Sequence, residues 1–330
     1  MNERDLRVLR IYHSAVVEGF RARDRLLRSH GVDETLISPR RWDEGGRDVV
    51  LELDDEESPW VVNALTWGRH PYRFAYSPRA LARHMTSDLH LIDVHEEPAS
   101  LATAEVLLLR AMRRLRVPVV LYSAQNLMKR FPPPFRWIER WALSTAHTIY
   151  CCNSDAAEVL RSKGFRGRLV VLGLGADVQS FSPRRSLGRG SVLRIGYVGR
   201  LEHHKGVHVL LDAISRVAAP VTLLVVGAGS EAQSLREMSD RLELGDRVVF
   251  QDFIAHHDLP PLYRDLDLLV VPSIPTPSWR EQFCRVAVEA MASAVPVIAS
   301  ADGALAEVVG PGGLLVPPGD SQALADAIES

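Results

Sequence analysis

The sequence predicts an α/β protein made of two doubly wound domains, each with a parallel sheet. Short β-branched runs alternate with segments of helical periodicity along most of the chain. The alternation is interrupted by a stretch rich in Pro, Gly, Ser and Arg, "FSPRRSLGRGS" at 181–191, and then restarts. A chain of 330 residues is long enough for two domains of ordinary size. We place these domains at 1–186 and 187–330.

In the first domain, the apolar run "LRVLRIYH" predicts a strand, and the amphipathic "FRARDRLLRSHG" predicts a helix that ends near Gly31. Alternation of this kind is typical of right-handed crossovers on a parallel sheet. Strands are expected over 6–13, 32–39, 89–95, 117–123, 148–154 and 168–175, and helices over 20–31, 100–116, 135–146 and 155–164.

In the second domain the same pattern begins with "LRIGYVGR" and ends with "SQALADAIES". Doubly wound sheets bind ligands at the carboxyl ends of their strands, and two facing domains would enclose a cleft. Strands are expected over 193–200, 221–229, 247–253, 268–273, 296–300 and 312–318, and helices over 206–217, 230–243, 257–266, from Cys284 onward, 301–309 and 321–330.

The composition, 46% apolar and 24% charged, is that of a soluble globular protein. No apolar run is long enough for a transmembrane helix, and the charged start "MNERDLRVLRIYH" lacks the apolar core of a secretion signal. The three cysteines form neither a disulfide framework nor a metal-spaced cluster, so we expect a reducing cytoplasm.

The net charge of −2 conceals an asymmetry, because residues 265–330 carry nine Asp or Glu and two Arg. Ordinary solvated faces are the favoured interpretation. The alternative is a mildly basic N-terminal half that meets an anionic partner, such as a phosphorylated acceptor or the inner face of a membrane. The basic density is too low for a nucleic-acid binder.

The segment "GYVGRLEHHKGVHVLLDA" places Arg200 and Lys205 between the end of a strand and the start of a helix. Backbone N–H groups and the helix dipole favour an anion there, and two cations suit a diphosphate. Surface cations flanking a turn are the equally weighted alternative. Downstream, "VVGAGSE" has only two glycines of a dinucleotide fingerprint, and we interpret it as a tight turn beside a nucleotide.

The stretch "WREQFCRVAVEA" carries two glutamates eight positions apart, Glu281 and Glu289. Eight helical steps turn roughly 80° beyond two full turns, so the pair would not share a helical stripe. We expect Glu281 in a loop and Glu289 inside a helix that starts near Cys284, so that both can reach one ligand. A surface position for Glu289 is the alternative, but an unpaired carboxylate in this apolar helix would be costly.

Three segments occur in the order and spacing of a known family: "GRLEHHKGVHVLLDA", "PSIPTPSWREQFCRVAVEAMASAVPVIASADGALAEVV" and "GGLLVPPGD". They closely resemble glycosyltransferase family 4 (glycosyl transferases group 1), and the resemblance covers the whole C-terminal domain. It implies a retaining hexosyltransferase of the GT-B fold, with two Rossmann-like domains facing across a cleft. A nucleotide-diphosphate sugar, UDP- or GDP-linked, would bind the C-terminal domain, and the acceptor the N-terminal one.

The two glutamates match the family's E-x7-E signature, in which the second holds the ribose hydroxyls and the first lies beside the donor sugar. The two cations match the pair that neutralises the diphosphate, and the resemblance implies no metal or other cofactor. The donor-binding residues it implies are Arg200, Lys205, Phe253, Glu281, Gln282, Phe283, Cys284 and Glu289.

In the N-terminal domain, "LIDVHEEPAS" ends a strand with His95, a residue that can exchange protons near neutral pH. It resembles the H-E-P segment of phosphatidylinositol mannosyltransferase-like members, which implies a catalytic His95 beside the transferred sugar, together with Glu281. Four further histidines, at 203, 204, 256 and 257, are expected at the surface. Candidate acceptor-side residues are Glu18, Gly19, Gln125 and Asn126.

Basic and aromatic residues interleave in "YSAQNLMKRFPPPFRWIERWA" at 122–142. This stretch can form part of the acceptor cleft or a peripheral membrane contact. The alternative is a strand-to-helix loop whose aromatic residues pack inward, and we favour it for Trp137 and Trp141.

The chain departs from its relatives at several places. Cys284 and Ala294 stand where glycine is frequent, and the chain ends at "ADAIES", whereas GT-B relatives continue to a final crossing helix. Cys284 is expected to be a packed thiol. These departures motivate an alternative function, a catalytically degenerate nucleotide-sugar-binding protein or partner subunit. A nicotinamide-dependent oxidoreductase is disfavoured, because the full glycine fingerprint is absent.

Overall fold

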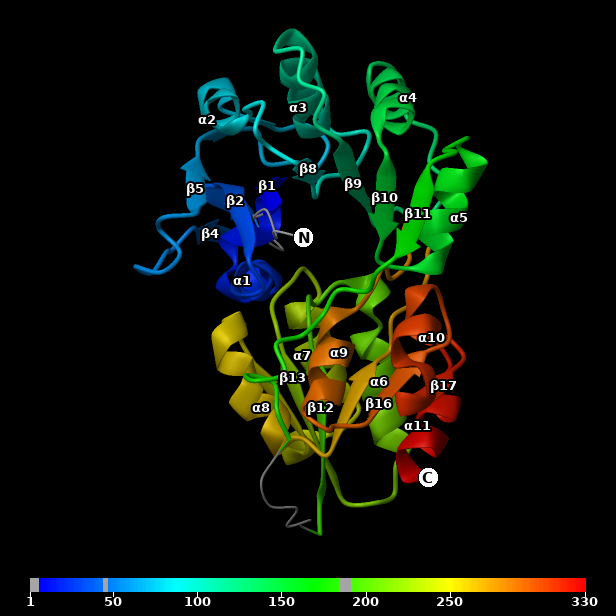
Figure 1. The fold of residues 1–330 in the computed structure, drawn as a ribbon. Helices are drawn as coiled ribbons and strands as arrows, with labels where there is room; N and C mark the ends of the chain where they lie inside the picture. The colour runs from blue at the N-terminus through cyan, green and yellow to red at the C-terminus, as the bar shows by residue number, and fades with distance from the viewer. Residues whose placement is uncertain (1–5, 44–46, 184–190) are drawn as a thin grey trace. The chain divides into compact units, whose positions relative to one another are not determined.

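The computed structural model describes residues 6–43, 47–183 and 191–330 and divides into two compact units, Met1–Leu172 and Gly173–Ser330 (Figure 1). The predicted domain boundary at 186/187 and most of the predicted linker at 181–191 lie outside the described residues. The division into units falls between Leu172 and Gly173. Phe181 is buried in the second unit, where its ring lies 5.7 Å from that of Tyr263.

Unit 1 contains a seven-stranded sheet in the order β11-β10-β9-β8-β1-β2-β5, in which every pair of neighbours is parallel. Its strands are β1 (Leu6–Ile11), β2 (Val32–Pro39), β5 (Val61–Ala64), β8 (Leu91–Val94), β9 (Val119–Ser123), β10 (Thr148–Cys151) and β11 (Arg168–Val171). Its helices are α1 (Ala22–Ser29), α2 (Pro78–His84), α3 (Leu101–Met112), α4 (Phe135–Thr145) and α5 (Ser154–Ser162), with the short 3-10 turns η1 (His13–Val16) and η2 (Glu18–Arg21).

Unit 2 contains a six-stranded parallel sheet in the order β14-β13-β12-β15-β16-β17. Its strands are β12 (Leu193–Val198), β13 (Val221–Val226), β14 (Val248–Gln251), β15 (Leu268–Val271), β16 (Val297–Ser300) and β17 (Gly313–Val316). Its helices are α6 (Val207–Arg216), α7 (Ala232–Arg241), α8 (Leu259–Asp265), α9 (Arg285–Ala292), α10 (Ala304–Val309) and α11 (Ser321–Glu329), and its 3-10 turns are η3 (His203–Lys205), η4 (Gly245–Arg247), η5 (His256–Asp258) and η6 (Gly310–Gly312).

The continuous apolar runs become strands that are covered on both faces. In β15 all four residues are buried, and successive side chains enter different cores: Leu268 and Val270 pack with α6, whereas Leu269 and Val271 pack with α9. This is the expected signature of a parallel strand inside a doubly wound sheet. The predicted α/β class with two Rossmann-like domains is therefore confirmed.

Both sheets reverse their strand order at one point. In unit 2 the first three strands run outward from β12, and the next three run the other way from β15, which is the Rossmann order. Unit 1 does the same on either side of β1 and β8. At such a switch point the chain continues from the two central strands to helices on opposite faces of the sheet, and ligands bind at the carboxyl edge between them.

The segment between 40 and 88 holds elements that were not predicted from the sequence. It forms two antiparallel hairpins, β3 (Arg41–Asp43) with β4 (Asp48–Val50) and β6 (Thr66–Trp67) with β7 (Ala75–Tyr76), besides β5 and α2. The strands are too short to show a period of their own. For α2 a signal was present, since Ser77 precedes Pro78 at the first helical position.

None of the helices in the described part of the chain combines the length and apolarity that crossing a bilayer requires.

Two of the departures from the family take backbone conformations that favour glycine. Cys284, which precedes α9, has φ of 70°, and Ala294, which follows it, has φ of 58°. The N–H groups of Ala294 and Val295 donate to the carbonyls of Met291 and Ala290, so Ala294 is the left-handed residue that closes α9. An L-residue with a Cβ is strained in this region, which explains why glycine suits both positions.

We predict that Ala294→Gly stabilises the protein. Relief of left-handed strain, about 1–2 kcal/mol, exceeds the entropic cost of glycine, about 0.5–1 kcal/mol, because Ala294 is exposed and packs little. The free energy of unfolding from urea titration should rise by about 0.5–1 kcal/mol. Ala290→Gly inside α9 is the matched control and should lower it by about 1 kcal/mol or more. A loss of stability in Ala294→Gly would contradict the assigned backbone.

Candidate functional site

The switch point of unit 2 brings two loops together. β12 and β15 are parallel neighbours, so the loops that follow them, 199–206 and 272–284, leave the same edge of the sheet. They are in contact, because the N–H of Ile274 donates to the carbonyl of His204 at 2.8 Å. A Cβ on Gly206 would come within 1.9 Å of the carbonyl oxygen of Pro272, so only glycine allows this approach.

Lys205 and Glu281 form the centre of this edge. The Lys205 Nζ donates to Glu281 Oε2 at 2.7 Å, and the Ser273 hydroxyl donates to the same oxygen at 3.1 Å. Both side chains of the ion pair are mostly buried, and the ammonium lies 4.7 Å from the centre of the Trp279 ring. The structure thus unites a predicted cation with the first predicted glutamate, and it adds Ser273 and Trp279, which the sequence analysis did not single out.

The loop that carries Glu281 is itself held in place. Arg280 donates to the carboxylate of Asp302 at 2.6 and 3.1 Å, which ties the loop to the segment before α10. The backbone N–H of Ala304 donates to the carbonyl of Glu281 at 3.4 Å. Glu281 is therefore positioned by contacts on both sides of it.

Arg200, the other predicted cation, is not part of that ion pair. Its guanidinium donates to Glu202 Oε1 at 2.7 Å, and its side chain is 45% exposed. Glu202 also lies 3.2 Å from His204 Nε2, and the His204 ring is 4.0 Å from that of Trp279. His204 is half-buried, so the prediction that it lies at the surface is wrong. Its burial lowers the pKa of the imidazole.

Glu289 lies inside α9, as predicted, and is buried. Its Oε2 accepts a hydrogen bond from the Tyr263 hydroxyl at 3.0 Å, and its Oε1 lies 2.9 Å from His256 Nε2. The prediction that His256 is a surface residue is wrong, because this ring contacts both Glu289 and Phe181. The α8 region therefore supplies the partners of the second glutamate.

The residues between the two glutamates differ in placement. Gln282 is exposed, Phe283 is buried and would contact a Cβ added at Gly173, and Cys284 is half-buried. Burial raises the pKa of the Cys284 thiol to about 12, which agrees with the expected packed, unreactive cysteine. Phe253, which follows β14, is 49% exposed.

The G-x-G turn after β13 also reaches this edge. A Cβ on Gly227 would lie 1.8 Å from the carbonyl oxygen of Gly199, and one on Gly229 would lie 2.2 Å from that of Leu201. The two glycines therefore let the turns after β12 and β13 pack backbone to backbone. This agrees with the tight turn that the sequence predicted.

His95 lies at the switch point of unit 1, directly after β8, and its N–H donates to the carbonyl of Ile11 in β1. The imidazole is 4% exposed and lies between two tyrosine rings, stacked on Tyr122 at 3.8 Å and tilted against Tyr12 at 4.1 Å. Its Nδ1 is 2.7 Å from the hydroxyl of Tyr150, which donates to Asp93 at 3.0 Å. The ring orientation is therefore fixed from three sides.

A buried charge cluster supports this histidine. Arg10 in β1 forms ion pairs with Asp93 at 2.7 Å and with Asp24 of α1 at 2.9 Å, and its Nη2 lies 3.3 Å from His95 Nδ1. Burial by itself would lower the pKa of Arg10, but the surrounding Tyr150 and acidic groups raise it well above its usual value. Burial and the neighbouring Asp24 raise the pKa of Glu34 in β2 to about 9. Glu34 is therefore protonated near neutral pH.

The two glutamates after His95 are structural acceptors. Glu96 accepts from the backbone N–H of His13 at 2.8 Å and from the Tyr76 hydroxyl at 2.9 Å. Glu97 accepts from the hydroxyl of Ser123 and the N–H of Ala124, both at 2.8 Å, and its pKa is raised by burial. The sequence His95-Glu96-Glu97-Pro98 has one glutamate more than the H-E-P pattern. Both glutamates are nevertheless hydrogen-bonded inside the protein.

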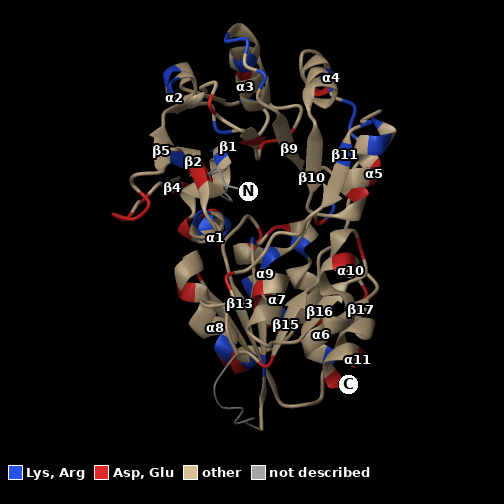
Figure 2. Cartoon of the chain, in the orientation of Figure 1, with Lys and Arg blue, Asp and Glu red and all other residues tan. Residues whose placement is uncertain are grey.

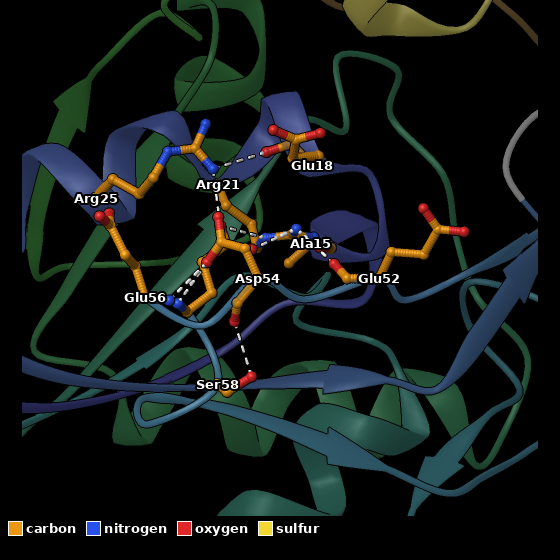
Figure 3. Close-up of polar contacts among 9 residues, drawn as sticks. Ala15, Glu18, Arg21, Arg25, Glu52, Asp54, Glu56 and Ser58 are labelled. Carbon is orange, nitrogen blue, oxygen red and sulfur yellow. Dashed lines mark hydrogen bonds and ion pairs between the residues drawn. The ribbon is translucent and has the colours of Figure 1, made fainter.

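The segment after β1 is anchored by Arg21, which is buried (Figure 3). Arg21 makes two bonds to Glu57, at 2.9 and 2.7 Å, and donates to the carbonyls of Ala15 and Glu52. Of the acceptor-side candidates in this segment, Glu18 is exposed and Gly19 half-buried. Arg21 fixes the loop that presents them.

The other two acceptor-side candidates are buried. Gln125 accepts from the Tyr72 hydroxyl at 3.1 Å, and its side-chain amide donates to the carbonyl of Leu127 at 3.0 Å, while Asn126 is 6% exposed. The prediction that Trp137 and Trp141 pack inward is wrong. Their side chains are 62% and 37% exposed, because α4 buries its Ala142 side.

The fold has close counterparts among solved structures. Sucrose-phosphate synthase from Thermosynechococcus elongatus superposes with a TM-score of 0.71 at 24% identity, over 99% of this chain and 89% of that one. Anabaena HepE in complex with UDP and glucose superposes with a TM-score of 0.66 at 22% identity, over 98% and 88%. Together with the two Rossmann-like sheets, these likenesses define the GT-B glycosyltransferase class of fold.

Two family models match the chain, glycosyltransferase family 4 over residues 25–180 and glycosyl transferases group 1 over residues 193–330. The chain therefore belongs to the group 1 and family 4 glycosyltransferases. It is 33% identical over 224 residues to a D-inositol 3-phosphate glycosyltransferase of Corynebacterium urealyticum, and 36% identical over 207 residues to a 2-deoxystreptamine N-acetyl-D-glucosaminyltransferase of Streptomyces fradiae. These alignments cover 60% and 57% of this chain but only 51% and 48% of the relatives, so the chain spans about half the length of the curated relatives it matches.

We predict that Glu34→Gln removes part of the pH dependence of stability. The folded protein holds a proton on Glu34 up to about pH 9, whereas the unfolded chain releases it near its ordinary pKa of 4.5. The contribution of Glu34 is therefore full below about pH 4.5 and is lost as the pH rises toward 9. Glutamine keeps a donor beside Asp24 and does not ionise.

Urea unfolding at about pH 5 and about pH 8.5 tests this. Between pH 5 and pH 8.5 the unsubstituted protein should lose stability relative to Glu34→Gln, by on the order of 4 kcal/mol. Glu237→Gln, at an exposed position in α7, is the control and should leave the pH profile unchanged. Parallel profiles for Glu34→Gln and the unsubstituted protein would contradict the protonated state.

Proposed function

We propose that the chain is a retaining glycosyltransferase that moves a hexosyl group from a nucleotide-diphosphate sugar to the hydroxyl of a glycan, lipid or small-molecule acceptor. The observation that carries the proposal is the ion pair of Lys205 and Glu281 at the switch point of unit 2, in a chain of this family. The donor is UDP- or GDP-linked. The UDP and UDP-glucose complexes of Anabaena HepE support UDP as the first nucleotide to test.

Lys205 and Arg200 are assigned to the donor diphosphate. When the bond to the sugar breaks, negative charge develops on the leaving diphosphate, and cations that are already in place stabilise it without reorganising. Lys205 ends the turn before the ten-residue α6, so the helix dipole adds to the same effect. Because the chain supplies this positive charge itself, we propose that transfer needs no metal.

Glu289 is assigned to the ribose hydroxyls. An ionised carboxylate can accept about four hydrogen bonds, and the Tyr263 hydroxyl and His256 engage only one direction at each oxygen. Two acceptor directions therefore remain for a pair of neighbouring hydroxyls. Tyr263 and His256 act as positioning residues, since they hold the carboxylate that makes this contact.

Glu281 is assigned to the donor sugar and His95 to proton exchange near the transferred sugar. A double displacement would need two carboxylates about 5 Å apart on either side of the bond. Since Glu289 is assigned to the ribose, we favour transfer on one face, in which the acceptor hydroxyl attacks as the diphosphate leaves.

We also propose that the protein acts in the cytoplasm, at the inner face of a membrane. Support for a reducing compartment comes from Cys151, Cys152 and Cys284, all of which are thiols.

We predict that Lys205→Met lowers kcat/KM for the nucleotide-sugar by roughly 100-fold to 1000-fold, as expected when one preorganised electrostatic group is removed. The assay measures release of the nucleoside diphosphate with an acceptor panel. Arg241→Met replaces an exposed cation of α7 and is the control, with kcat/KM near that of the unsubstituted protein. Normal turnover in Lys205→Met would refute the assigned role.

We predict that a nucleoside diphosphate raises the melting temperature of the protein and that Glu289→Gln weakens this effect. A ligand at about 100 times its dissociation constant stabilises by about 2.7 kcal/mol. The panel consists of UDP, GDP, UDP-glucose and GDP-mannose, with Glu237→Gln as the matched control. If the protein binds a nucleotide-sugar but yields no product in any acceptor assay, the alternative function is supported instead. That alternative is a catalytically degenerate nucleotide-sugar-binding protein or partner subunit.

A further inference from the structure

Two neighbouring helices of unit 1 leave large apolar side chains in solvent. On α3, Leu108 is 53% and Met112 is 70% exposed, and on α4, Trp137 is 62% and Trp141 is 37% exposed. Each pair is spaced four residues apart, so each forms a stripe along its helix. Such exposure is not needed for packing, because α4 already buries Ala142 and α3 already buries Val106 and Leu107.

The two stripes belong to one surface. α3 and α4 follow consecutive strands, β8 and β9, and right-handed crossovers place both helices on the same face of the sheet. They pack against each other (Figure 1). Each helix buries its sheet-facing side, so the exposed stripes of both helices point away from the sheet. We call this surface, with its flanking segments 113–116 and 128–130, the α3–α4 face.

The α3–α4 face is strongly basic. Residues 108–141 contain eight Lys or Arg and one acidic residue, whereas the whole chain carries a net charge of −2. The acidic residue, Glu139, is paired with Lys163 at 2.6 Å. In Figure 2, basic residues are drawn in blue at the end of α3 and in the loop that follows it. The exposed cations of the face are Arg113, Arg114, Arg116, Lys129, Arg130, Arg136 and Arg140.

We infer that the α3–α4 face docks on an anionic phospholipid bilayer. Tryptophan, methionine and leucine can enter the headgroup region, where tryptophan is especially favoured, while arginine side chains reach the phosphates. A nucleic acid would neutralise the cations but leave the apolar stripes in water. A bilayer surface satisfies both the charge and the apolar groups. This inference deepens the proposed location and does not depend on the transferase activity.

The test measures binding of the full chain to vesicles by co-sedimentation, without donor or acceptor. Vesicles contain phosphatidylglycerol and phosphatidylcholine in equal parts, or phosphatidylcholine alone. We expect binding only to the anionic vesicles, weakened by added salt. Each cation contributes about fivefold to partitioning, so Arg136→Glu/Arg140→Glu should reduce binding at least tenfold. Trp137→Ala/Trp141→Ala, which keeps every charge, should also reduce it at least tenfold.

Matched controls come from elsewhere on the surface. Trp67→Ala removes a tryptophan that is 60% exposed in β6, and Arg241→Glu reverses an exposed cation in α7. Both controls should bind as the unsubstituted protein does, and circular dichroism checks that each variant is folded.

Absence of binding to anionic vesicles at low salt would overturn the inference, as would unchanged binding in both double variants. Binding to a single-stranded oligonucleotide that is lost in the arginine variant but kept in the tryptophan variant, without vesicle binding, would assign the face to nucleic acid instead. Each of these readouts is independent of turnover, so an inactive protein that binds vesicles would refute only the proposed function.

Discussion

The reversal of strand order in each parallel sheet is the constraint on which both candidate sites depend. Because all strands of a sheet point the same way, their following loops gather at one edge, and only at the reversal do two neighbouring loops turn to opposite faces. In unit 2, Lys205 after β12 and Glu281 after β15 lie at this reversal and form an ion pair. In unit 1 it places His95 after β8 beside Tyr12 after β1. The same topology therefore presents one charged pair in unit 2 and one imidazole in unit 1.

Charge inside the two units is used to hold side chains in fixed positions. Arg10 bridges Asp24 and Asp93, and the second acid binds Tyr150, which contacts His95. Such a buried arrangement adds little net stability, since desolvation offsets most of the attraction, but removal of one partner leaves an uncompensated charge. The consequence of this arrangement is that the imidazole of His95 is held in one orientation. An imidazole stacked between two rings and bound through Nδ1 has few alternative positions, as preorganised proton transfer requires.

The two glutamates of unit 2, Glu281 and Glu289, have different environments. Glu281 is in a loop and pairs with an ammonium that also faces an indole ring. Glu289 is in a helix and is held by a phenol and an imidazole. These environments are the basis for the roles proposed for them, the first beside a charged group and the second as an acceptor of hydrogen bonds from neutral hydroxyls. The α3–α4 face of unit 1 is basic and aromatic, and the role inferred for it is independent of the candidate site in unit 2.

The sequence by itself determined the α/β class, almost every element of unit 2, and the residue types at its site. Periodicity and the position of apolar runs suffice for these, because they depend on neighbours within a few residues. The presence of β5, the hairpins between 40 and 88 and the partners of Glu289 were decided by the tertiary structure. His256 and Tyr263 precede Glu289 by more than twenty residues, and only the packing of α8 on α9 brings them to it. Trp137 and Trp141 are a second case in which the sequence was not sufficient. Aromatic residues usually lie inside, and only the assembled sheet determines which side of α4 is buried and leaves these two indoles in solvent.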